Sequence, residues 1–112
     1  MIFRKDLIEL VARGEKTQTR RKHKRTLNAG RIYAVKLNWF KETGLYLRIT
    51  RACKQRLGDI TQEDAAKEGF SGVEEFKAKW IHINGSWDPE LIVTVYDFEL
   101  AEKDDKTQSK LA

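Results

Sequence analysis

Apolar residues in the first part of the chain recur at helical spacing and then lose any regular period. Within 5–13 they form a single stripe, which predicts an amphipathic helix that ends before Gly14, a residue that favours the left-handed C-cap position. Residues 15–30 have no sustained apolar period and finish on the turn signal Asn28-Ala29-Gly30, so we expect a long connection with room for one short strand. Loops of this length in a small domain usually carry function. The stripe consists of Leu7, Ile8, Leu10 and Val11.

Strand-like patterns dominate the middle and the end of the sequence. Residues 31–37 and 45–50 are β-favouring runs that predict a hairpin with a long loop, its second strand continuing over 51–57 until Gly58-Asp59. The unbroken run 91–100 predicts a long central strand. Because helices and strands do not alternate as βαβ units, the pattern points to an α+β fold with a small, mostly antiparallel β-barrel flanked by short helices. The hairpin residues expected to face the core are Leu45, Leu47 and Ile49.

Two further helices are predicted between these strand regions. Thr61-Gln62-Glu63-Asp64 approximates a capping box, and the short helix that it begins should stop at Gly69. Ser71-Gly72-Val73-Glu74 is read as a second capping box, followed by an apolar stripe that lasts until Asn84-Gly85. We assign the aromatic members of this stripe to packing, because they fall on one helical face. The stripe consists of Val73, Phe76, Trp80 and Ile83.

Length and composition limit the class of protein. A chain of 112 residues with 40% apolar and 35% charged residues is expected to form one domain, over 1–101, followed by a disordered polar tail over 102–112. No apolar run approaches the roughly 20 residues of a membrane span, and the chain turns charged by Arg4, too early for a signal peptide. Cys53 is the only cysteine, which excludes an intrachain disulfide. These features favour a cytoplasmic location.

Positive charge is concentrated rather than spread. Between Arg13 and Arg25 seven lysines and arginines stand against one glutamate, a net charge of +6, so the rest of the chain carries −1 of the total of +5. Such a local excess creates a positive field that suits a polyanion. RNA or DNA is therefore the leading partner, while the plainer interpretation is a solvated loop whose charges serve solubility.

The segment Gly14-Glu15-Lys16-Thr17-Gln18-Thr19-Arg20, after the predicted first helix, resembles the Gly-x-Lys-x-x-Thr-x-Arg signature of ASCH domains, a family of the PUA-like superfamily. The resemblance covers roughly 1–101, and its segments follow one another in the order typical of small archaeal-type ASCH proteins. It implies a PUA-like β-barrel with a cleft suited to RNA or a nucleoside. The other segments that carry it are Leu57-Gly58-Asp59-Ile60-Thr61, Lys67-Glu68-Gly69-Phe70, Glu74-Glu75-Phe76 and Trp87-Asp88-Pro89.

The resemblance also implies three candidate catalytic residues. Some ASCH proteins are similar to small bacterial amidohydrolases that remove acetate from N4-acetylcytidine, and Lys16, Thr19 and Glu68 match the Lys, Thr and Glu of those enzymes. In that scheme Thr19 attacks the acetyl carbonyl, Lys16 handles the proton and Glu68 holds Lys16. The scheme requires a bend in the chain, because residues three apart face opposite sides of a regular strand. It also requires that burial or nearby cations lower the pKa of Lys16 against Glu68, and the plainer interpretation of this pair is a simple ion pair.

General attraction for RNA would come from neighbouring cations and from one aromatic side chain. Closely spaced cations can contact successive phosphates. Trp39, beside Phe40 in the predicted hairpin loop, is a candidate for stacking on an unpaired base, although such aromatics more often belong to the core. The cations predicted to contact phosphate are Arg20, Arg21, Lys22, Lys24 and Arg25.

The remaining chemistry-bearing residues predict little. His23 and His82 have no partners at ligand spacing, so neither a metal nor a cofactor is expected, and Cys53 is read as a small core residue. Three functions stay open, with a monomer as the default state. The first is an RNA- or nucleoside-binding protein of RNA metabolism, the second an N4-acetylcytidine amidohydrolase that releases acetate and cytidine, and the third, ranked last for want of a histidine acid-base motif, a ribonuclease.

Overall fold

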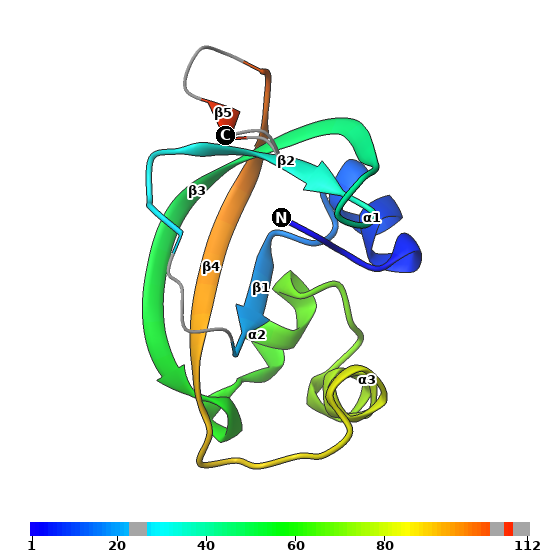
Figure 1. The fold of residues 1–112 in the computed structure, drawn as a ribbon. Coiled ribbons are helices and arrows are strands. Elements are labelled where there is room, and N and C mark those ends of the chain that lie inside the picture. The colour runs from blue at the N-terminus through cyan, green and yellow to red at the C-terminus, as the bar shows by residue number, and fades with distance from the viewer. Residues whose placement is uncertain (23–26, 104–106, 109–112) are drawn as a thin grey trace.

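Two long antiparallel strands, β3 (Glu42–Arg56) and β4 (Ile92–Ala101), form the centre of the structure, a computed structural model that describes residues 1–22, 27–103 and 107–108 (Figure 1). They pair from Tyr46 opposite Ala101 to Arg56 opposite Ile92, with one register shift between Ile49 and Arg51. A register shift of this kind bends a strand and increases its twist. The long β3 accordingly curves across the whole height of the molecule in Figure 1.

Shorter strands extend the sheet on both sides. β1 (Gln18–Arg21) pairs antiparallel with β4, and β2 (Ile32–Lys36) pairs antiparallel with β3, in the order β1-β4-β3-β2-β5. The short β5 (Thr107–Gln108) pairs with β2 in parallel. The predicted hairpin, the extension of its second strand and the central strand near the end of the chain are all present, and the α+β class is confirmed.

The outer edge of β2 is shared between β5 and the N-terminal segment. Ile2 forms a parallel bridge with Lys36, and the Phe3 N–H donates to the Lys36 carbonyl at 3.0 Å. Across the described residues no ladder joins β1 to β2, so hydrogen bonding around the predicted barrel is incomplete. The first three residues take the place of a further strand. The domain boundary at 101 stays a prediction, and within the expected tail the structure describes residues 102, 103 and β5.

Helices occupy the space beside the sheet. They are α1 (Lys5–Ala12), the 3-10 helix η1 (Leu57–Asp59), α2 (Gln62–Lys67) and α3 (Val73–Asn84). As predicted, α1 is followed by a left-handed Gly14, with φ of 74°, and α3 ends at a left-handed Gly85, with φ of 91°. No described helix is long and apolar enough to cross a membrane.

The two capping predictions have opposite outcomes. The box at α2 is confirmed, because the Asp64 N–H donates to Thr61 Oγ1 at 3.1 Å and the Thr61 N–H donates to the Asp64 carboxylate at 3.2 Å. The second box is wrong: the N-cap of α3 is Gly72, and the Val73 N–H donates to Gln62 Oε1 of α2 at 2.7 Å. A side chain from the neighbouring helix caps α3, which local sequence could not reveal.

Buried side chains gather in two clusters. The first lies between α1 and the sheet and includes Leu47 and Ile49, as predicted, with Leu45 half-buried at its margin. The second contains Phe76 and Trp80 of α3, also as predicted. Ile83 is a correction, because at 39% exposure it lies outside the packed stripe. Each fully buried apolar side chain contributes about 1.5–3 kcal/mol, so these clusters hold the helices against the sheet.

Candidate functional site

A cavity of about 280 Å³ lies beside β1, bounded by the N-terminal segment and by α3. Its volume is close to the roughly 300 Å³ at which pockets for small molecules begin. One part of the lining, called here the polar wall, consists of Lys16, Thr19, Arg20, Arg21, Lys22 and Glu68. The aromatic lining consists of Phe3, Phe70, Phe76 and Trp80. A pocket with this composition offers a flat apolar surface next to charged groups.

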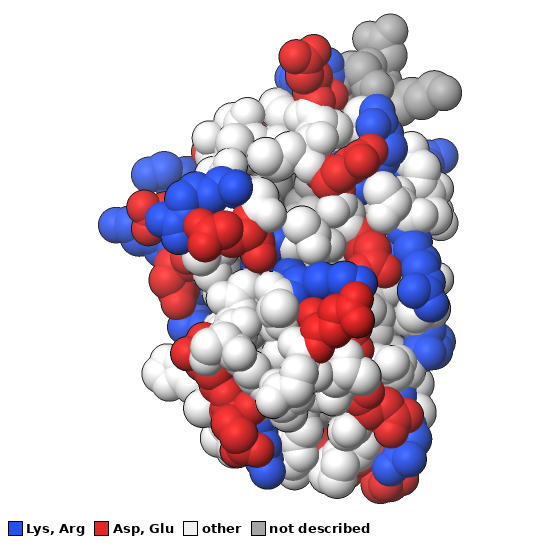
Figure 2. Space-filling view, turned by 180° about the vertical axis from the view of Figure 1, so that it is seen from behind, with Lys and Arg blue, Asp and Glu red and all other residues white. Residues whose placement is uncertain are grey.

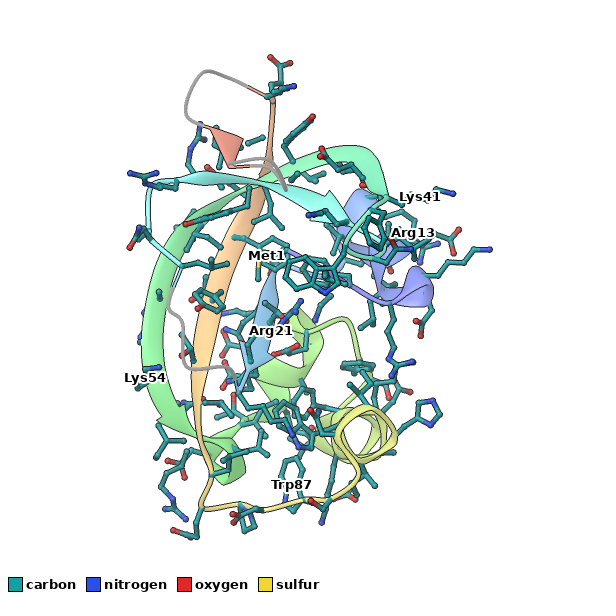
Figure 3. The ribbon with its side chains drawn as sticks, in the orientation of Figure 1. Met1, Arg13, Arg21, Lys41, Lys54 and Trp87 are labelled. Carbon is teal, nitrogen blue, oxygen red and sulfur yellow. The ribbon has the colours of Figure 1, made fainter. Side chains whose placement is uncertain are left out.

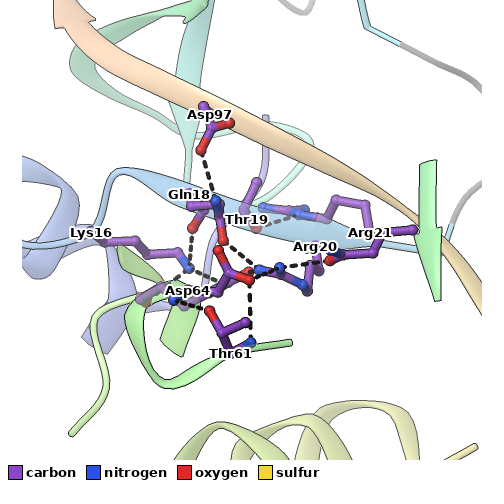
Figure 4. Close-up of polar contacts among 10 residues, drawn as sticks. Lys16, Gln18, Thr19, Arg20, Arg21, Thr61, Asp64 and Asp97 are labelled. Carbon is purple, nitrogen blue, oxygen red and sulfur yellow. Dashed lines mark hydrogen bonds and ion pairs between the residues drawn. The ribbon is translucent and has the colours of Figure 1, made fainter. Parts of the chain in front are cut away.

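The alternation of a β-strand sorts the polar wall into two faces. Successive side chains of a strand point to opposite sides. Gln18 donates to Asp97 (Figure 4) and Arg20 donates to Glu68. Arg21, by contrast, lies over the ring of Phe3. Lys16 continues the first face, since its side chain also ends at Glu68. Lys16 and Thr19 therefore line one pocket, and no hydrogen bond joins them in the described part of the chain.

Lys16 is held by three acceptors at once. Its Nζ donates to the Gln18 carbonyl at 2.9 Å, to the Glu68 carbonyl at 3.0 Å and to Glu68 Oε1 at 2.7 Å. An ammonium group has three hydrogens, so every donor is used. Burial lowers the pKa of Lys16 from its ordinary value, while the Glu68 carboxylate opposes that shift. The side chain is 2% exposed, so its amine lies inside the protein.

Arg20 belongs to the same ion network, defined here as Lys16, Arg20, Asp64 and Glu68. Its Nη1 donates to Glu68 Oε2 at 3.0 Å and to the amide oxygen of Gln18, and its Nη2 donates to Gln55 Oε1 at 2.9 Å and lies 3.2 Å from the Asp64 carboxylate. Only Nε has no partner among the described residues. The interpretation of Arg20 as one of the phosphate-contacting cations therefore needs correcting, because its charge is turned inward.

Asp64 connects this network to the end of α2. Burial alone would raise the pKa of its carboxyl, but the hydrogen bonds from Thr61 and the guanidinium of Arg20 outweigh that effect and lower it. The carboxylate thus stabilises both the capping box and the buried arginine. Removal of one partner from a buried ion pair commonly costs about 3–5 kcal/mol, so the network is a strong constraint on β1.

Arg21 and Thr19 form a separate pair on the opposite face of β1. The Arg21 Nε donates to Thr19 Oγ1 at 3.1 Å, and the guanidinium carbon lies 4.7 Å from the centre of the Phe3 ring. Burial lowers the pKa of Arg21, again opposed by Glu68, but an arginine stays charged at neutral pH. In Figure 3 Arg21 lies near the centre of the view, whereas Lys54 and Trp87 lie toward its margins.

The other predicted RNA contacts are scattered. Lys22 is exposed at the pocket, whereas Lys24 and Arg25 lie outside the described residues. Trp39 is 72% exposed in the turn between β2 and β3, with the Lys36 amine 5.7 Å from the centre of its ring. Its neighbour Phe40 is 86% exposed. The hairpin turn therefore presents two aromatic rings to solvent rather than to the core.

The remaining candidates do not form a further site. Trp87 packs edge-on against Phe76, with ring centres 6.2 Å apart, and Cys53 is a half-buried free thiol on β3. His82 is exposed on α3, and His23 lies outside the described part of the chain. Among residues 1–22, 27–103 and 107–108 no three metal-ligating side chains gather. Basic and acidic side chains are interspersed on the face shown in Figure 2, so that face has no continuous basic surface.

Several residues of the site were missed from the sequence. Gln18, which links Lys16, Arg20 and Asp97, could have been found from the alternation within β1. Asp64 and Phe3 had no such signal, because their roles depend on contacts with residues more than 15 positions away.

Comparisons with known proteins agree with this architecture. The model of the ASCH domain family matches residues 1–102. The ASCH domain structure from Lactobacillus crispatus JV V101 has a TM-score of 0.63 at 19% identity, with 85% of this chain and 70% of that chain covered. A protein from Enterococcus faecalis V583 has the same TM-score and identity, with 86% and 67% covered. No curated protein matches the sequence. With its family model spanning almost the whole chain and its fold shared with a solved member, this protein belongs to the ASCH domain family.

Proposed function

We propose that this ASCH domain binds RNA and takes one nucleotide or nucleoside into the pocket beside β1. The family is linked to RNA binding at the family level. The observation that carries the proposal is the composition of the pocket, in which the polar wall adjoins the aromatic lining. Proteins that bind unpaired bases place them against aromatic rings and satisfy their polar edges with hydrogen bonds.

The charge of the pocket supports a polyanionic ligand. Six of its lining residues are basic, and Glu68 is the one acidic residue among them. Lys16 and Arg20 are compensated by the ion network, and Lys79 pairs with Asp6 at 2.6 Å. Three lining cations have no ion pair within the part of the chain that the structure describes. They are Arg4, Arg21 and Lys22.

The exposed hairpin turn would extend binding beyond the pocket. Lys36 contacts the ring of Trp39 and also bridges Ile2, which lines the pocket. Trp39 is thus two contacts away from the cavity. A base that flanks the bound nucleotide would stack on this ring, with the Lys36 amine nearby for its phosphate.

The test is a titration of a fluorescent, single-stranded RNA of mixed sequence with the full chain at low salt. We expect saturable binding, and about a fivefold or greater loss of affinity in Trp39→Ala, because one base-stacking contact contributes roughly 1–3 kcal/mol. Ile92→Ala is the control, since Ile92 is also exposed, at 56%, but lies on β4 outside the pocket lining. Absence of binding by the wild-type chain at low salt would defeat the proposal.

One observation keeps the amidohydrolase as a second candidate. Lys16, Thr19 and Glu68, which lie far apart in sequence, line the same pocket. In this function Thr19 Oγ1 would attack the acetyl carbonyl of N4-acetylcytidine. Its activation would have to come from a rearrangement of Lys16, because all three hydrogens of that amine are donated elsewhere.

Incubation with N4-acetylcytidine and chromatography of the products test this second candidate. Cytidine release by the wild type that is lost in Thr19→Val would support it, since valine keeps the shape of threonine without the hydroxyl. No release above the blank removes its basis. RNA recovered from the binding titration tests the third candidate, because a ribonuclease would leave shortened strands.

A further inference from the structure

We propose that Thr19, Arg21 and Phe3 form an oxyanion subsite that selects ligands carrying a phosphate group over neutral nucleosides. The inference rests on the proposed function, because it specifies what part of an RNA ligand enters the pocket. It also separates two ligand classes, free nucleosides and phosphorylated nucleotides, that the proposed function leaves together.

The guanidinium of Arg21 is prepared for an external acceptor. Its Nε is occupied by Thr19 Oγ1, and its carbon lies 4.7 Å from the Phe3 ring centre, so the group is held along one edge and over one face. Its two Nη atoms have no hydrogen-bond or ion-pair partner among the described residues. Neither Nη is both fully buried and unpaired, so each retains some accessible surface, and Arg21 is one of the residues that line the pocket.

Thr19 adds a further donor next to this fork. Its Oγ1 accepts from Arg21, and within the described ranges its own hydroxyl hydrogen has no acceptor. Thr19 is 4% exposed and lines the pocket, so a ligand atom in the pocket can accept this hydrogen. Together the two residues offer donors from Oγ1 and both Nη atoms, against one remaining lone pair on Oγ1.

The neighbouring buried cations have few donors left for a ligand. Lys16 donates all three hydrogens to protein oxygens, and Arg20 makes three hydrogen bonds through its Nη atoms and an ion pair with Asp64. Arg21 is therefore the half-buried cation of the polar wall whose Nη atoms have no acceptor among the described residues. An array in which donors predominate favours a group rich in acceptor oxygens and disfavours an amine.

Phosphate fits this array better than a carboxylate does. A carboxylate has two oxygens, so one of them must serve both the arginine fork and Thr19. A phosphate monoester has three terminal oxygens, so two can meet the fork while another accepts from Thr19, whereas a phosphodiester must share one of its two non-bridging oxygens. The group could be the terminal phosphate of a nucleotide or the internal phosphodiester of an RNA strand.

Calorimetric titration of the full chain with four probes distinguishes these sources. The probes are cytidine, cytidine 5′-monophosphate, the dinucleotide CpC without a terminal phosphate, and inorganic phosphate. We expect the monophosphate to bind about tenfold or more tightly than cytidine, because hydrogen bonds between charged groups are the strong class. Tight binding of CpC as well identifies the internal phosphodiester as sufficient, and tight binding of the monophosphate alone identifies the terminal group.

Variants assign the preference to these residues. Arg21→Gln should remove the preference for the monophosphate while leaving the affinity for cytidine within about twofold, and Arg21→Lys should restore only part of it, because lysine lacks the bidentate fork. Arg51→Gln removes the same charge from β3, where Arg51 is 70% exposed, and should leave the preference unchanged. Thermal unfolding of each variant verifies that it is folded.

Two results would overturn the proposal: equal binding of cytidine and the monophosphate by the wild type, or equal loss of both ligands in Arg21→Gln. Failure of the proposed function looks different. If phosphate shifts the Arg21 Nε–H resonance in an NMR titration but no probe with a base binds more tightly than phosphate, the oxyanion subsite stands and the RNA pocket does not. If phosphate leaves that resonance unmoved while cytidine binds, the pocket stands and the subsite does not.

Discussion

At the scale of single residues, Glu68 has the largest structural role in the site. Its carboxylate accepts from Lys16 through Oε1 and from Arg20 through Oε2, and its carbonyl accepts from Lys16 again. All three side chains are almost fully buried. Two buried cations thus depend on the Glu68 carboxylate. Asp64 supplies a second carboxylate, which pairs with Arg20.

Glu68→Gln should destabilise the protein by about 3–5 kcal/mol, because it leaves a buried lysine and a buried arginine with one charge fewer to balance them. Urea unfolding measures the loss. Glu63→Gln on the same helix is the matched control: Glu63 is 81% exposed and pairs with Lys67 at 3.7 Å, so its removal should cost less than about 1 kcal/mol. Equal effects of the two changes would mean that the ion network does not constrain the fold.

Asp64 should make stability depend on pH in the acid range. Because its folded pKa is lowered, its contribution is complete above the ordinary value of about 3.9 and is lost as the pH falls through the folded pKa. The free energy of unfolding of Asp64→Asn should therefore differ from that of the wild type at pH 6 and approach it below about pH 4. Urea unfolding at both pH values checks this, and a difference that is the same at pH 6 and pH 3 would contradict it.

At the scale of elements, the short connection between β3 and α2 shows how close backbone contact positions the site. The Leu57 N–H donates to the Leu91 carbonyl at 2.8 Å, and the Gly58 N–H donates to the Pro89 carbonyl at 2.9 Å. These bonds hold η1 against the chain that enters β4. Since α2 follows within a few residues, these hydrogen bonds also determine where Glu68 lies.

Gly58→Ala should destabilise the protein by about 1–3 kcal/mol through overpacking. A Cβ atom at Gly58 would lie 2.7 Å from Pro89 Cβ and 3.0 Å from the Pro89 carbonyl oxygen, and neither can move without shifting the backbone. Asp59→Ala, next to it and half-exposed, should change the free energy of unfolding by less than about 1 kcal/mol. Thermal or urea unfolding compares them, and a Gly58→Ala protein as stable as the wild type would mean that the connection relaxes freely.

At the scale of the whole molecule, the cations differ in whether a carboxylate lies close enough to pair with them. Five described cations outside the pocket face a carboxylate, such as Arg48 with Glu99 and Arg56 with Glu90. At the pocket three cations without an ion pair among the described residues line one cavity: Arg4, Arg21 and Lys22. Attraction of RNA is therefore expected to come from the pocket side of the molecule.

The salt dependence of RNA affinity tests this expectation. Arg21→Gln and Lys22→Gln should each reduce the slope of log affinity against log salt by about 1, because each removes one phosphate contact and the counterion that it releases. Arg51→Gln, on β3 outside the pocket, should leave the slope unchanged. Titrations at four salt concentrations give the slopes, and equal reductions by all three variants would indicate unspecific attraction to net charge.

Much of the fold was predictable because its signals are local. The periods of apolar residues located α1, the hairpin strands and β4, and Gly14, Gly69 and Gly85 marked helix ends through their left-handed backbone. The second capping box failed for the complementary reason: Gln62, eleven residues before Val73, satisfies that N–H instead of Ser71. A local pattern is reliable only where no distant side chain competes for the same group.

Patterns in the sequence predicted the α+β class and the ASCH resemblance, and the resemblance made Lys16, Thr19 and Glu68 candidates for one site. That all three line one pocket, and how the basic segment divides, became visible in the folded structure. The alternation of β1 turns Lys16 and Arg20 toward Glu68, where their hydrogens are used, and turns Thr19 and Arg21 toward Phe3, where donors remain free. The sequence states which side chains carry a positive charge. Whether their hydrogen-bond donors are available to a ligand depends on which acceptors the fold brings within hydrogen-bonding distance.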